Sequence, residues 1–436
     1  MMDSSPSYRV RIAGFCLLLV LPVVAATAQP TALPARLSFE DARTLFLRSN
    51  PELKAARANA EHRTQQARIP ALWPNPALDA RRRQVRRPRG GIGSENTVTV
   101  EQSLRYPNEH RSLQRAADAH AIVFEERYTE EAAALYRMLR ERYAETQAAR
   151  LRLDILWATT EAVRRALHIA EVRYEEGDIG TVDRARLRVA RATYEDRLEE
   201  AQKDDRDARI ELAYFLQPSG HADHHEIDEA MRTDSLVYRP LDPEYDALVD
   251  AALDRRGLLA AAEAEHTARE QTLHAARYAR LPEVGVAAGY RAETQPGVVA
   301  SGFTVGLRIG LPVFHQNQPQ VRAAEAGVDA ARYAIAEAQR RVELDVHDAY
   351  ERLRSYERRI ENISGALLPD TGRLLDDALY VYEEGEISLS GLLDTIEAAR
   401  TARLLHIDLL LGHALSRYDL ERALGVGPTD TSPFGE

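Results

Sequence analysis

The chain is an internal duplication. Residues 174–179 read Tyr-Glu-Glu-Gly-Asp-Ile, and residues 382–387, which lie 208 positions later, read Tyr-Glu-Glu-Gly-Glu-Ile. The same offset relates other identical pairs: Ala60 and Ala268, Thr64 and Thr272, and Pro74 and Pro282. A period this long exceeds the ~20–50 residues of solenoid and propeller repeats. Each half is therefore expected to be a complete structural unit that packs against its copy.

Long stretches without helix-breaking residues predict long helices. Residues 108–176 contain neither glycine nor proline, and only two glycines interrupt residues 320–366. At ~1.5 Å per residue, the first stretch would form a rod of roughly 100 Å. After each repeated motif the apolar residues follow a 3,4 spacing that is typical of coiled-coil seams. We expect each long helix to fold back at Gly177 or Gly385, which gives two helical hairpins.

Each half also contains a segment bounded by prolines, at about residues 75–107 and 283–312. Between residues 303 and 311, apolar side chains alternate strictly with polar or small ones. Strands of about 9–11 residues with this alternation are typical of transmembrane β-barrel walls. A sheet packed on helices would alternate in the same way, so that alternative stays open. Four strands cannot close a barrel, and an open edge cannot lie in lipid, so a barrel requires several chains.

Arg82 is a difficulty for the barrel interpretation. It is separated from the apolar residues Leu78 and Ala80 by an even number of positions, so all three lie on the same face of the strand. An arginine facing lipid costs ~2–4 kcal/mol at the bilayer midplane and ~0–1 kcal/mol near an interface. We therefore expect Arg82 at the outer rim of the barrel, against anionic lipid headgroups.

The N-terminus indicates export. Arg9 and Arg11 precede an apolar run over residues 12–26, which predicts a cleavable signal peptide at residues 1–28. The run is shorter than the ~20 residues that a membrane-spanning helix needs. Cys16, the only cysteine, lacks a small residue directly before it, so no lipid anchor is expected.

Several classes of function find no support in the sequence. The formal net charge of -11 does not favour binding to nucleic acid. The chain has no phosphate-binding glycine loop and no nucleophile-elbow motif, and removal of the signal peptide would remove its one thiol. We expect neither an enzyme nor a cofactor.

A cluster of histidines and carboxylates lies between the two halves. His221, Asp223, His224 and His225 could bind zinc or copper transiently. A solvated connector explains the same residues, because nothing in the sequence fixes their geometry. We treat them as weak metal candidates and assign no metal site.

Over about residues 37–425 the pattern resembles the TolC family of outer membrane efflux proteins, in the branch associated with cation and drug resistance-nodulation-division (RND) pumps. The resemblance rests on strand pairs inserted in two helical hairpins, on the repeated tip motifs, and on two further motifs. These are Leu-Leu-Asp at residues 392–394 and Leu-x-x-Ala-Leu-Gly at residues 420–425.

The resemblance implies a mainly α fold with a small transmembrane β-barrel, made of two tandem repeats. An α-helical barrel and a β-barrel would be completed by trimerisation. The expected regions are the signal peptide (1–28), the first repeat (29–217, with strands at about 75–107 and a tip at 174–183), an inter-repeat linker (218–243), the second repeat (244–425, with strands at about 283–312 and a tip at 382–394), and a flexible tail (426–436).

The resemblance also implies roles for residues at the tips. Gly177, Ile179, Gly385 and Ile387 would dock a periplasmic adaptor, because glycine allows close approach of the backbone. The alternative is that they only form sharp turns.

Three residues match the family's gate. Asp183 and Tyr382 correspond to a linking aspartate and tyrosine, and Asp394 to an aspartate at the constriction. Ile387 and Gly391 stand where one well-studied type has an arginine and a second aspartate, so an Arg-Asp gate is not expected here. A hydrogen bond from Tyr382 to Asp183 between neighbouring hairpins is expected instead, with solvated carboxylates as the alternative.

The function implied by the resemblance is a passive exit duct in the outer membrane. It would be a homotrimer surrounded by outer membrane lipid, receiving metal cations or drugs from an RND-type inner-membrane pump through a periplasmic adaptor. Two alternatives remain at this stage: the outer membrane duct of a type I protein-secretion system, and a soluble periplasmic coiled-coil scaffold.

Overall fold

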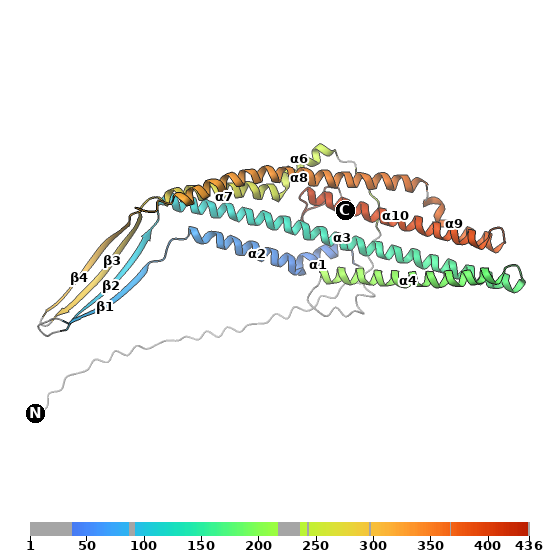
Figure 1. The fold of residues 1–436 in the computed structure, drawn as a ribbon, viewed down its shortest axis with the longest axis horizontal. Helices are drawn as coiled ribbons and strands as arrows, with labels where there is room; N and C mark the ends of the chain where they lie inside the picture. Colours follow the sequence, from blue (N-terminus) through green and yellow to red (C-terminus); the bar gives the residue numbers. More distant parts are fainter. Residues whose placement is uncertain are drawn as a thin grey trace, which may run out of the picture.

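The structure, a computed structural model, describes residues 37–86, 92–216, 236–241, 244–295, 298–366 and 368–434. The predicted signal peptide and the histidine cluster at 221–225 lie outside these ranges, as does most of the predicted linker. The molecule is elongated, with a β-sheet at one end, two hairpin turns at the other, and long helices between them (Figure 1). Within the described ranges, no helix combines the length and the apolar composition needed to cross a membrane.

The two halves repeat one order of elements. The first half contains α1 (Phe39–Ser49), α2 (Pro51–Arg68), the short 3-10 helix η1 (Ile69–Ala71), β1 (Ala77–Arg86), β2 (Ile92–Leu104), α3 (Pro107–Glu176) and α4 (Thr181–Leu216). The second half contains α6 (Tyr245–Arg255), α7 (Gly257–Tyr278), β3 (Glu283–Gln295), β4 (Val298–Gly310), α8 (Gln318–Ala366), α9 (Leu368–Glu383) and α10 (Leu389–Ala423). The predicted mainly α fold with two tandem repeats and strand pairs is thereby confirmed.

The halves differ in their long helical segments. The helix α3 is continuous over 70 residues, whereas the corresponding part of the second half is divided into α8 and α9. Pro369 is the second residue of α9. Proline is tolerated in a first helical turn, where the amide hydrogen has no partner, but it disrupts a helix interior. The first half has no proline at the equivalent position, so α3 runs unbroken from the sheet to the tip.

The four strands form one antiparallel sheet in the order β1-β2-β3-β4. Its register aligns apolar residues in rows on one face, such as Leu78, Val100, Ala288 and Val305. This face is open in the described part of the chain, where the side chains of Phe303 and Val305 are 87% and 88% exposed. The sheet lies beyond the ends of the helices (Figure 1). The alternative in which the sheet packs on the chain's own helices is therefore not the arrangement found.

Arg256 connects the two halves near the middle of the molecule. It is 3% exposed, and it donates hydrogen bonds to Glu130 of α3, Asp345 of α8 and the backbone carbonyl of Ala423 in α10. A buried charge is tolerated when it is paired and hydrogen-bonded in this way. Arg256 therefore fixes α3, α8 and α10 relative to one another.

The terminal motif at residues 420–425 forms a helix cap. Gly425 has a φ of 78°, and the amide of Val426 donates to the carbonyl of Glu421, as in a Schellman motif. The chain then turns back: Val426 is buried, and Arg43 donates to the carbonyl of Pro428 at 2.8 Å. Of the predicted flexible tail (426–436), the described residues 426–434 are thus held against the helices.

Candidate functional site: the hairpin tips

Both hairpin turns close with the same geometry. Gly177 and Gly385 have φ values of 89° and 79°, in the left-handed region that favours glycine. In each turn the amide after the glycine donates to a carbonyl five residues earlier: Asp178 to Arg173 at 2.8 Å, and Glu386 to Val381 at 3.0 Å. The duplication is therefore preserved in the backbone hydrogen bonds, and both glycines lie exposed at the far end of the molecule.

Unlike the exposed glycines, the isoleucines of the two motifs face the helices. Ile179 and Ile387 are partly buried and pack against an apolar cluster, here called the tip cluster, which is built from α3, α4, α9 and α10. Its fully buried members include Leu187, Leu392 and Ile396. The shared isoleucine thus anchors each turn to the helices, while the glycine is left at the surface.

Tyr382 is the largest fully buried side chain of the tip cluster, at 1% exposed. Its hydroxyl has no hydrogen-bond partner among the described residues. Burial raises the pKa of this phenol; the guanidinium of Arg173 opposes the rise and the carboxylate of Asp183 adds to it. Asp183 therefore acts on Tyr382 through its charge, and the predicted hydrogen bond between the two residues is not formed within the chain.

Arg173 is a contact that the sequence analysis missed. Its Nη1 donates to the backbone carbonyl of Tyr382 at 2.9 Å, and its guanidinium lies 5.3 Å from the centre of the Tyr382 ring. This contact joins α3 of the first hairpin to α9 of the second. A comparison of the two repeats could have singled it out. The position equivalent to Arg173 in the second repeat is Val381, so this arginine belongs to the first hairpin alone.

The two predicted gate aspartates lie in different surroundings. Asp183 is partly buried in the first turn of α4, whereas Asp394 is exposed on α10. The structure brings Asp183 toward Tyr382 within one chain. It places Asp394 on the surface near the same tip.

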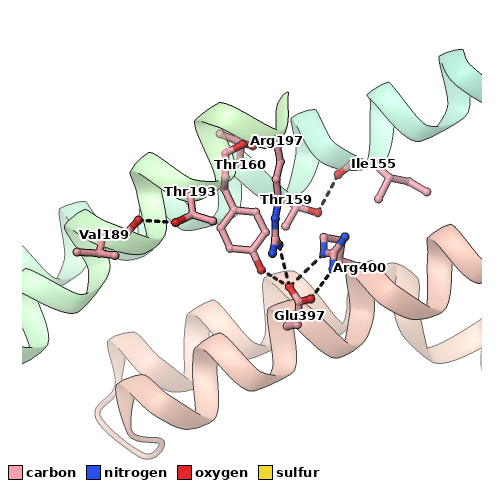
Figure 2. A network of polar contacts seen from close by, with 9 residues as sticks. Ile155, Thr159, Thr160, Val189, Thr193, Arg197, Glu397 and Arg400 are labelled. Carbon is pink, nitrogen blue, oxygen red and sulfur yellow. Dashed lines mark hydrogen bonds and ion pairs between the residues drawn. The ribbon is translucent and has the colours of Figure 1, made fainter. Parts of the chain in front are cut away.

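A polar network joins α4 to α10 one turn beyond Asp394 (Figure 2). The hydroxyl of Tyr194 donates to Glu397 at 2.7 Å, and the guanidinium of Arg197 lies 3.3 Å from the same carboxylate oxygen. Arg400 donates to this oxygen through Nε at 3.1 Å. One carboxylate therefore accepts hydrogen bonds from both hairpins.

The network shifts the pKa of two of its members. The hydrogen bond from Arg400, with a further one from Tyr194, lowers the pKa of Glu397 to about 2, against the effect of partial burial. Burial, followed by the hydrogen bond to Glu397, raises the pKa of Tyr194 to about 12. Glu397 is thus ionised and Tyr194 protonated across the physiological pH range.

Two further ion pairs connect the hairpins at the surface. Arg165 of α3 lies 3.1 Å from Asp376 of α9, and Arg152 of α3 lies 2.7 Å from Asp408 of α10. Exposed pairs of this kind contribute about 0–1 kcal/mol each. These two pairs therefore add little to the tip cluster and the Glu397 network, which join the hairpins near the tips.

No group of three or more potential metal ligands occurs in the part of the chain that the structure describes. The weak candidates His221, Asp223, His224 and His225 lie outside that part and remain a hypothesis.

Residues 248–426 match a protein family described as outer membrane efflux protein. The cobalt-zinc-cadmium resistance protein CzcC of Cupriavidus metallidurans is 24% identical over 280 residues, which is 64% of each chain. The match therefore spans just under two thirds of the length of that relative.

Solved structures share the fold over nearly the whole chain. A membrane protein from Pseudomonas aeruginosa has a TM-score of 0.74 at 21% identity, covering 89% of this chain and 90% of its own. The CmeC outer membrane channel of Campylobacter jejuni has a TM-score of 0.76 at 15% identity, covering 98% and 96%.

Proposed function

We propose that the chain is the outer membrane channel of a tripartite efflux system, because residues 248–426 match the outer membrane efflux protein family and the chain has the fold of solved outer membrane channels. The observation that carries the proposal is the open sheet at the end of a long helical body. One face of that sheet is apolar and exposed, and the other is polar, as the wall of a water-filled barrel in lipid requires.

The working form is a homotrimer in this proposal. The outer strands β1 and β4 each have one edge that no described strand covers. Unpaired backbone groups cannot lie in hydrocarbon, so neighbouring copies must supply the missing strands. Three copies would give twelve strands, an even number within the range of bacterial barrels.

The register of the sheet supports an orientation in the membrane. Arg82 pairs with Asn96, and the same row continues through Ala292 to Ser301. On the same face of the sheet, the next two rows toward the helices contain the exposed apolar residues Phe303 and Val305. This change from apolar to small or polar residues supports an outer interface at the level of Arg82, where anionic headgroups of outer membrane lipid would pair with it.

The tips dock a periplasmic adaptor in this scheme. Gly177 and Gly385 are exposed and would allow close approach of another backbone. Each turn also carries three exposed acidic residues: Glu175, Glu176 and Asp178 in one, and Glu383, Glu384 and Glu386 in the other. A partner surface with basic residues would complement them.

Metal cations are the proposed cargo, delivered by an RND-type inner-membrane pump through the adaptor. The name of the relative CzcC refers to cobalt, zinc and cadmium. Asp183 and Asp394, the proposed gate residues, would favour cations at the tip. The duct is passive in this proposal, and the free energy for transport comes from the pump.

Gene deletion with complementation tests the function. Loss of the protein should lower the concentrations of cobalt, zinc and cadmium salts that the cells tolerate, and expression of the full chain should restore them. Sensitivity to dyes and antibiotics without sensitivity to metals would redirect the proposal to drugs. Loss of protein secretion instead would favour a type I duct.

Fractionation tests the location. The mature chain should be found in the outer membrane without residues 1–28 and without a lipid modification, as mass spectrometry would show. Recovery from the periplasm as a soluble protein without detergent would support the scaffold alternative and exclude the channel.

A further inference from the structure

The polar face of the sheet carries arginines whose charges are paired across strands. Arg308 of β4 lies with its Nη1 2.7 Å from Oε1 of Glu101 in β2, so its side chain crosses over β3. Arg291 of β3 lies with its Nε 3.0 Å from Oε1 of Glu95, also in β2. Each arginine therefore lies close to the wall of the sheet and is compensated by a glutamate.

Small residues of β3 make room for the contact between Arg308 and Glu101, which reaches from β4 across β3 to β2. Gly285 pairs with Arg308, and Ala287 pairs with both Glu101 and Gly306. A Cβ atom added to Gly285 would lie 3.7 Å from Cβ of Arg308 and 3.7 Å from Oε1 of Glu101. An alanine would touch both side chains there, and a larger residue would displace them. The sequence of β3 thus keeps a path open for one particular ion pair.

The position of the pair along the strands determines where it acts. Glu101 and Arg308 lie near the ends of β2 and β4 that lead into the helices. The side chain of Arg308 is 74% exposed and that of Glu101 is 24% exposed. In a trimeric barrel, the polar face would surround water, and three copies of the pair would form a ring where the helical tunnel opens into the barrel.

We propose that Glu101 is a selectivity residue: it neutralises Arg308 at the inner mouth of the β-barrel, so that cations can pass a ring of arginines. This inference rests on the proposed channel function. Without Glu101, three unpaired guanidinium groups would face the lumen and repel cations electrostatically. With Glu101 in place, the ring of Glu101–Arg308 pairs is close to neutral, and a cation meets no electrostatic barrier there.

Planar-bilayer recordings of the purified full-length protein in a potassium chloride gradient test this assignment. Glu101→Gln should shift the reversal potential toward the chloride equilibrium potential, and Arg308→Gln should shift it toward that of potassium. The double variant E101Q/R308Q is the matched control, because it changes both side chains but leaves the net charge unchanged. Its reversal potential should lie close to that of the wild type. The shifts should shrink at ~1 M salt, where the Debye length falls to ~3 Å.

The outcomes distinguish the inference from its premise. Wild-type reversal potentials in both single variants would overturn the role of the pair while leaving the channel function intact. Absence of conductance in the wild type would overturn both. If E101Q fails to assemble, R308Q and the charge-swapped variant E101R/R308E remain. The swapped pair should retain wild-type selectivity, and a shift toward anions in it would also contradict the proposal.

Discussion

Tyr382 illustrates how the surroundings of one residue decide its role. The family resemblance implied a position at the gate for it, as the donor of a hydrogen bond to Asp183. Within the chain, its ring fills the tip cluster, its backbone carbonyl binds Arg173, and its hydroxyl is buried without a partner among the described residues. A hydroxyl in this state adds no hydrogen bond to stability, whereas the ring adds buried apolar area.

The variant Tyr382→Phe separates these two contributions. We expect the free energy of local opening at residues 382–386 to stay within about 1 kcal/mol of the wild type, because only an unpartnered hydroxyl is removed. Hydrogen exchange of the backbone amides would measure it. A loss of about 1.5–3 kcal/mol in the assembled protein, with none in the isolated chain, would instead reveal a bond to Asp183 of a neighbouring copy.

At the scale of elements, the Glu397 network helps to hold α10 to α4, beside the tip cluster. The pKa of Glu397 is lowered to about 2 in the folded chain, below its value of ~4.3 in an unfolded one. A group with a lowered folded pKa stabilises the structure above its unfolded pKa and loses that contribution as the pH falls through the folded one. The contact should therefore be fully formed above about pH 5 and weaken progressively toward about pH 2.

This linkage predicts a pH-dependent opening of the hairpins. Hydrogen exchange over residues 389–400 should show less protection at pH 3 than at pH 7 in the wild type, after correction for the intrinsic exchange rate. In Glu397→Gln, which cannot titrate, the protection should be reduced at pH 7 and should change less between the two pH values. An equal pH dependence in both proteins would assign the effect to other carboxylates.

The sheet depends on one close approach between strands. A Cβ atom at Gly289 would lie 2.6 Å from the carbonyl oxygen of Val98 and 2.7 Å from Oγ1 of Thr99. The backbone oxygen cannot move away without breaking the pairing of β2 and β3. Gly289→Ala should therefore prevent assembly of the folded oligomer, at a cost of several times the ~1 kcal/mol typical of a point substitution.

Gly306→Ala is the matched control for this prediction. A Cβ atom there would meet only the Cβ of Ala287, at an ordinary contact distance of 3.7 Å. Electrophoresis without heating, which keeps folded membrane oligomers intact, should show an oligomer for Gly306→Ala and none for Gly289→Ala. Equal yields of oligomer from the two variants would contradict the steric argument.

For the whole molecule, the sequence predicted most of the architecture and little of the side-chain network. The duplication, the proline-bounded strands and the turn glycines report on backbone geometry, which local sequence determines directly. The resemblance to outer membrane efflux proteins is confirmed by the comparisons with known proteins. Glu397, Arg173 and Arg256 were missed, because an isolated charged residue in a helical stretch gives no indication of which distant helix will pack beside it.

The proposed assembly makes a prediction about docking at this scale. Replacing Glu383, Glu384 and Glu386 with glutamine removes three exposed charges from one tip. Affinity for the cognate adaptor should fall by on the order of tenfold at low salt, because rim charges mainly increase association rates. Surface plasmon resonance at two salt concentrations would measure this effect.

A control with the same change in charge lies on the side of α4. The variant E199Q/E200Q/D204N removes three exposed acidic charges but leaves both tips unchanged. It should bind the adaptor as the wild type does. If the two triple variants lose affinity equally, net charge rather than the tip explains the loss.

The unequal division of the two long helical segments has a mechanical consequence. A force applied at Gly177 is transmitted along one uninterrupted rod, α3, to the strand that precedes it. A force applied at Gly385 is instead transmitted toward the sheet through α9 and then α8, two separate helices. The two halves of a duplicated chain therefore transmit load along different paths, one through a single helix and the other through two helices in succession.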